Sequence, residues 1–173
     1  MGRTWLLGAA ALAGALAGCG GPTTAVPDPL RFPPGEATVL RLKASGAQVY
    51  ECKASAQDPA KLEWVLRAPE ASLYNANNRN VGKHYGGPTW EAHDGSRVVG
   101  EVRARADSPD PNAIPWLLLS LRQTGTPGLL SRTKSVQRVE TEGGKPPASC
   151  GAGEAGQTLR VPYQAVYVFS DAR

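Results

Sequence analysis

The chain has 173 residues, with 19 Lys and Arg against 15 Asp and Glu, and its formal net charge at pH 7 is +4. This length is enough for one domain with a single hydrophobic core. The basic residues are scattered among carboxylates and form no run, so we expect no nucleic-acid partner. The chain contains no internal repeat, coiled-coil heptad or second hydrophobic span.

The N-terminus has the pattern of an export signal. One Arg precedes an uncharged apolar run that is about a dozen residues long, whereas a membrane-spanning helix needs roughly 20. Residues 16–19 are Leu-Ala-Gly-Cys, which resembles a bacterial lipobox. The pattern predicts a signal peptide over 1–18 and a diacylglycerol on the thiol of Cys19. Ala15 and Ala17 form an alternative site for ordinary signal peptidase, which would leave Cys19 as a lone thiol.

The lipobox predicts an exported protein held at a membrane of the cell envelope by its lipid. Stable anchoring in a membrane requires more than one acyl chain, and a diacylglycerol supplies two. Gly20, in place of Asp, favours the periplasmic face of the outer membrane in a cell with two membranes. Residues 19–36 then comprise the lipidated Cys and a Pro-rich tether that could reach roughly 50 Å from the bilayer, and the domain occupies 37–173.

Cys52 and Cys150 remain once Cys19 carries lipid. An even pair in an exported protein predicts a disulfide, and two buried thiols are the alternative. There is no CxxC motif, so the cysteines do not indicate oxidoreductase chemistry.

Alternation of apolar and polar residues dominates the rest of the chain and predicts an all-β fold, an antiparallel β-sandwich or barrel. Turn pairs separate the alternating segments, which are residues 40–43, 50–53, 62–67, 98–105 and 165–170, with turns expected at Ser45-Gly46, Asp94-Gly95 and Gly143-Gly144. Residues 116–121 are almost continuously apolar, which favours a buried strand over one or two turns of helix.

An ordered set of short segments resembles the family catalogued as domain of unknown function 3455. The set spans most of the chain after residue 48 and comprises residues 48–52, 68–71, 81–85, 87–91, 94–96, 114–118, 137–138, 141–144, 147, 150 and 161–163. Residues 75–80 depart from the family pattern because they are rich in Asn where an acidic residue and a Gly are expected. The resemblance implies an exported protein and supplies no mechanism.

Residues 84–96 contain both histidines, His84 and His93, together with Glu91 and Asp94. Two imidazoles and a carboxylate could bind zinc or act as a general acid and base. The spacing matches no fixed ligand motif, and Asp94-Gly95 is also explained by a hairpin alone, so we commit to no metal and expect no cofactor.

Aromatic residues offer a second candidate site. Tyr85, Trp90 and Glu91 could form a binding pocket or face, and Trp90 is expected to be exposed because polar and turn residues flank it. Trp64 and Trp116 are expected in the core.

We interpret the chain as a monomeric envelope lipoprotein that binds a small molecule, glycan or protein near Tyr85, Trp90 and Glu91. One alternative is a metal-assisted or acid/base hydrolase that uses His84, Glu91 and His93. A structural envelope component is the other.

Overall fold

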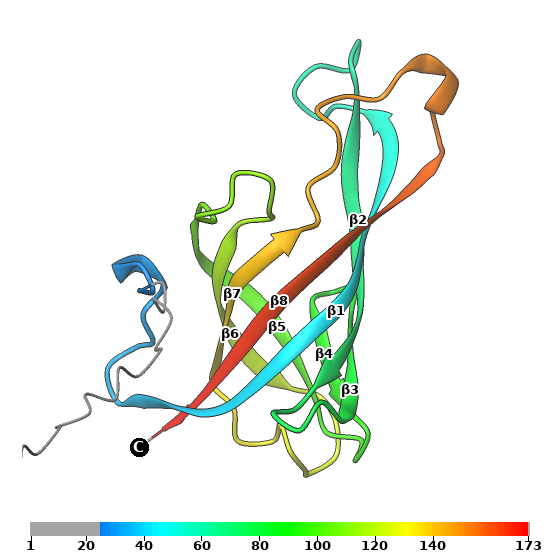
Figure 1. Cartoon of the computed structure of the whole chain (residues 1–173). Helices are drawn as coiled ribbons and strands as arrows, with labels where there is room; N and C mark the ends of the chain where they lie inside the picture. Colours follow the sequence, from blue (N-terminus) through cyan, green and yellow to red (C-terminus); the bar gives the residue numbers. More distant parts are fainter. Residues whose placement is uncertain (1–24, 173) are drawn as a thin grey trace, which may run out of the picture.

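The computed structural model describes residues 25–172, so the expected signal peptide and Cys19 lie outside the described residues. The described chain forms a closed antiparallel barrel in which each strand pairs with the next and β8 returns to β1 (Figure 1). The all-β prediction is confirmed, in its barrel form. The strands are β1 Glu36–Ala54, β2 Leu62–Tyr74, β3 Asn80–Tyr85, β4 Thr89–Ala92, β5 Arg97–Ala106, β6 Trp116–Gln123, β7 Ser135–Gly143 and β8 Thr158–Ala172, with short 3-10 helices η1 Asp28–Leu30 and η2 Ala152–Glu154.

Alternation along each strand sends one set of side chains into the barrel. Apolar and aromatic residues fill part of the interior and form the inner core, which consists of Leu42, Ala44, Leu73, Trp90, Ala92, Val98, Leu119, Leu130, Val136, Tyr167 and Phe169. The apolar run over 116–121 is strand, as expected: Trp116 and Leu118 lie in a second core cluster, while Leu119 lies in the inner core.

The second cluster contains Leu30 of η1 together with strand residues Trp116, Leu118, Val139 and Val168. Leu30 is completely buried there, and its carbonyl accepts a hydrogen bond of 2.6 Å from the Gln137 amide. Residues 26–32, which we call the strap, thus cover an outer wall of the barrel. The expectation of an extended tether up to residue 36 is therefore wrong for this part, because its apolar side chains have a hydrophobic surface to cover.

The turn expected at Ser45-Gly46 is also wrong. Both residues lie inside β1, where Gly46 pairs with Ala71 of β2 and Tyr163 of β8. A Cβ atom at position 46 would lie 2.1 Å from the carbonyl oxygen of Glu70. Glycine is needed here for the close approach of two strands and not for a turn.

Two other turns follow the local sequence. Asp94-Gly95 connects β4 to β5, with Gly95 at φ 84°, and Asp94 accepts hydrogen bonds from the backbone and the hydroxyl of Ser96. In the Asn-rich turn between β2 and β3, Asn78 has φ 54° and the side chain of Asn75 accepts backbone hydrogen bonds from Asn77 and Arg79.

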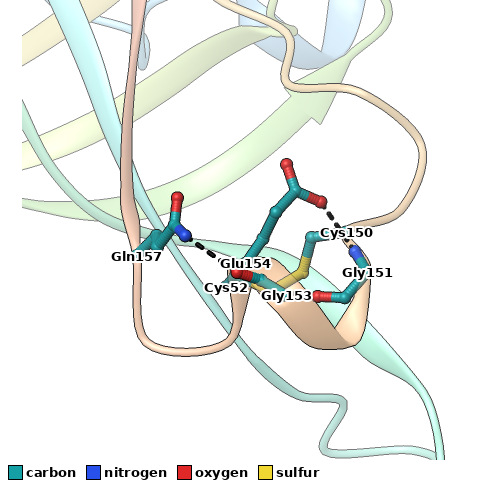
Figure 2. The surroundings of a disulfide bond; sticks show 6 residues. All are labelled: Cys52, Cys150, Gly151, Gly153, Glu154 and Gln157. Atoms are coloured by element: carbon teal, nitrogen blue, oxygen red, sulfur yellow. Dashed lines mark hydrogen bonds between the residues drawn. A yellow bond between two sulfur atoms is a disulfide. The ribbon is translucent and has the colours of Figure 1, made fainter.

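Strands β1, β2 and β8 continue beyond the barrel as a long ribbon, and the segment between β7 and β8 follows them (Figure 1). The predicted disulfide joins the ribbon to this segment: Cys52 and Cys150 are bonded, with their Cα atoms 6.0 Å apart. Figure 2 shows the adjoining η2 turn, in which Gly151 donates to the Glu154 carboxylate and Gln157 donates to the carbonyl of Gly153. Within the described chain, no helix is long and apolar enough to cross a membrane.

Candidate functional site

A gap in the barrel wall results from the short hairpin β3–β4. The β2–β3 ladder extends only from Tyr74 to Ala71, and the β4–β5 ladder ends at Val99. The rest of β2 and the rest of β5 have no strand between them, because the chain turns back at residues 86–88. An opening into the barrel is therefore expected above this turn.

A cavity of about 270 Å³ occupies this position. At its mouth lie the exposed side chains of Leu66 and Val102, which are 50% and 52% exposed, and the turn residue Gly87. The cavity reaches inward to Gln48, His84, Trp90, Leu119 and Tyr167, whose side chains are at most 3% exposed. Leu117 and Arg138, which are partly buried, also line it.

His84 and Trp90 face each other across β3 and β4 and form the aromatic floor of the cavity. Their rings stack with centroids 4.4 Å apart, and Tyr167 packs edge-on against both of them. Gly100 leaves room for the indole, since a Cβ atom at this position would lie 2.9 Å from Cζ3 of Trp90.

His84 is neutral in this setting. Burial lowers its pKa to about 3, and the charge of Arg138 acts in the same direction, while the hydrogen bond to the Thr89 carbonyl opposes the shift. Because a carbonyl can only accept, Nδ1 of His84 must donate in the 2.8 Å hydrogen bond to Thr89. Nε2 therefore carries a free lone pair and is a hydrogen-bond acceptor.

Two buried nitrogen atoms at the cavity residues have no hydrogen-bond partner among the described residues. They are Nε1 of Trp90 and Nε2 of Gln48, and both side chains are 1% exposed. A buried donor without a partner costs about 1–3 kcal/mol, so such groups are rare in folded proteins. Both residues line the cavity, although the two nitrogen atoms themselves have almost no accessible surface.

Arg138 of β7 is the cation of the cavity interior. Its Nε and Nη2 both donate to the carbonyl of Pro115, at 3.0 and 2.8 Å. Burial raises the pKa of Tyr50, Tyr163 and Tyr167, and the positive charge of Arg138 acts against this rise in all three. The surroundings of Arg138 are therefore uncharged phenols and an uncharged imidazole.

The predicted binding face at Tyr85, Trp90 and Glu91 is divided by the pleat of the hairpin. Trp90 points into the barrel and is 1% exposed, so the expectation that it is exposed is wrong. Tyr85 and Glu91 lie on the other side, where the Tyr85 hydroxyl donates to Glu91 at 2.7 Å and Lys83 lies 3.3 Å from the same carboxylate. The Tyr85 hydrogen bond, with help from Lys83 and Arg97, lowers the pKa of Glu91.

The two histidines are not brought together. His84 is buried in the barrel, whereas His93 is exposed and its Nε2 lies 2.5 Å from the side-chain oxygen of Asn80. Asp94 accepts from Ser96 and from the backbone of Leu129, and the bonds from Ser96 are the chief cause of its lowered pKa. Within residues 25–172, no group of three or more His, Cys, Asp or Glu side chains is placed to hold a metal ion.

Sequence reasoning missed Gln48 and Arg138 as members of the site. Each lies in a strand, and only the pairing of β1, β7 and β8 brings them to one cavity. The signal for such residues is a polar or charged side chain that points into the barrel. Recognising it requires the register of the strands, which the sequence alone does not give.

Comparisons with known proteins give a family and no activity. No curated protein and no solved structure matches the chain significantly. A family model described as "Protein of unknown function (DUF3455)" matches residues 33–171, which contain the whole barrel apart from its last residue, and the chain therefore belongs to this family.

Proposed function

We propose that this chain is a non-enzymatic binding protein that takes one small molecule with an apolar body into the barrel cavity. The observation that carries the proposal is an open, mostly apolar cavity whose lining includes the polar side chains of Gln48, His84 and Arg138. Binding sites are typically concave and apolar with a few polar groups that orient the ligand, and eight-stranded barrels are wide enough to hold one small ligand.

The polar groups that line the cavity include both donors and an acceptor. The indole of Trp90 can only donate, and Nε2 of His84 can only accept in the tautomer that the Thr89 hydrogen bond selects. The hydrolase alternative has less support, because it needs His84 and His93 in one site and the barrel wall separates them.

Binding of Nile red, an uncharged dye that fluoresces in apolar surroundings, tests the proposal. We expect saturable binding of one dye per chain. Val102→Trp should weaken binding about tenfold or more, because the larger side chain narrows the mouth of the cavity. Val39→Trp is the matched control, since Val39 is 56% exposed and does not line this cavity. Lack of dye binding, or equal binding by both variants, would overturn the proposal.

We further propose that the protein is an exported envelope lipoprotein with its lipid on Cys19. The supporting observation is the Leu-Ala-Gly-Cys pattern after a short uncharged apolar run. Mass spectrometry of the N-terminal peptide from the expressing bacterium should find a diacylglyceryl group on Cys19, and Cys19→Ser should release the protein from membranes. A mature N-terminus at Gly18, without lipid, would support simple secretion instead.

A further inference from the structure

The charge of Arg138 carries an inference about the head group of the ligand. Arg138 faces the cavity from β7, directly opposite Leu117 of β6 and Tyr167 of β8, and both of these neighbours also line the cavity. None of the ion pairs among residues 25–172 includes Arg138. Its side chain donates two hydrogen bonds to the neutral carbonyl of Pro115 and also hydrogen-bonds to the uncharged phenol of Tyr167.

A guanidinium that lines a mostly apolar cavity is unusual when it has no counter-charge. Arginine cannot lose its proton in a protein, so the charge stays even when the surroundings are apolar. The titratable groups around it are His84, Tyr50, Tyr163 and Tyr167, and their shifted pKa values keep all of them uncharged near neutral pH. The interior of the cavity therefore carries a net positive charge with no anion to balance it.

We propose that the cavity binds an organic anion, a small carboxylate with an apolar body, whose head group pairs with Arg138. This inference rests on the proposed binding function. Guanidinium groups favour carboxylates through charge-assisted hydrogen bonds, which are about twice as strong as neutral ones. Gln48 and Trp90 line the same cavity, and each has a buried side-chain nitrogen without a hydrogen-bond partner among the described residues. Leu66, Val102 and Leu119 offer apolar contacts for the body of the ligand.

Two pairs of probes test the charge while the apolar part is held constant. Octanoate is compared with 1-octanol, and 3-phenylpropanoate with 3-phenylpropan-1-ol, each by its ability to displace Nile red at pH 7.5. We expect at least one acid to bind about tenfold or more tightly than its alcohol, as a charged hydrogen bond predicts. This comparison uses the unchanged protein, so it does not depend on the folding of any variant.

Arg138→Met should remove the preference for the acid and leave the affinity for the alcohol within about twofold, and Arg138→Lys should restore part of the preference. Arg160→Met is the matched control, because Arg160 is exposed, pairs with Glu70 at 2.7 Å and does not line the cavity. Acid and alcohol of equal affinity, or acids that do not displace the dye, would overturn this inference and leave the proposed function standing. Failure of Nile red itself to bind would overturn the proposed function.

Discussion

The environment of the buried His84 side chain differs strongly from that of a free imidazole. This residue is 3% exposed, stacked on Trp90 and neutral, with a pKa of about 3 against an ordinary value of 6.5. The imidazole therefore contributes to the fold as an aromatic ring with one donor and one acceptor. A proton on Nε2 would place a second positive charge in the cavity that already contains Arg138.

This burial predicts a pH-dependent stability. Between pH 6.5 and 3 the unfolded chain binds a proton at position 84 and the folded chain does not, so the free energy of unfolding falls as the pH falls. For this residue the loss is about 2 kcal/mol between pH 7 and pH 5. Urea denaturation should show this loss in the unchanged protein and a markedly smaller one in His84→Gln. His93→Gln is the matched control. Identical pH profiles for His84→Gln and the unchanged protein would mean that folding does not shift the pKa of His84.

Trp90 illustrates what local sequence cannot determine about a single residue. Its neighbours Thr89 and Glu91 are polar, which suggested exposure, yet Thr89 is buried as well and its hydroxyl donates to the carbonyl of Gly86. The direction of Trp90 follows from its position opposite His84, and this pairing depends on where the hairpin turns. A polar context therefore indicated a tight turn and not an exposed indole.

At the scale of elements, the short hairpin β3–β4 determines where the cavity opens. Its turn at residues 86–88 brings the carbonyl of Pro88 to the backbone N–H of Gly100, and above this point β2 and β5 have no strand between them. Alternation predicted most strands, because each has one apolar side. It could not predict that two strands end early, since that depends on the length of their neighbours.

The disulfide stabilises a different part of the fold, the ribbon beyond the barrel. It joins two residues that are 98 positions apart in the sequence. The backbone of Cys52 also forms hydrogen bonds with the backbone of residues 156 and 157. The double variant Cys52→Ser/Cys150→Ser should lower the free energy of unfolding by about 2–4 kcal/mol in chemical denaturation. Its affinity for Nile red should stay unchanged, because neither cysteine lines the cavity. A large loss of dye binding would indicate that the ribbon shapes the cavity.

On the scale of the whole molecule, the barrel has hydrophobic residues on both sides of its wall. The inner core fills part of the lumen, and the strap covers the outer cluster around Trp116. The sequence predicted one core for a domain of this size. The second cluster was not predictable, because η1 has too few residues to show a period and its prolines indicated an extended chain.

The strap should therefore contribute to global stability. Leu30→Ala should lower the free energy of unfolding by about 2–5 kcal/mol, as expected for truncation of a completely buried Leu. Leu129→Ala is the matched control, because Leu129 is 44% exposed. Thermal and urea denaturation of the two variants measure the difference. Equal stability of both would show that the strap detaches from the barrel at little cost.

The strap also limits how far the barrel could lie from a membrane. With Val26 already packed beside the outer cluster, only the backbone from Cys19 to Val26 would remain as a free connection, and its greatest possible length is about 25 Å. A lipid on Cys19 would then hold the strap within about 25 Å of the bilayer surface, roughly half the reach of an extended tether. A carboxylate with an apolar body that leaves the membrane would therefore meet the barrel near the bilayer surface.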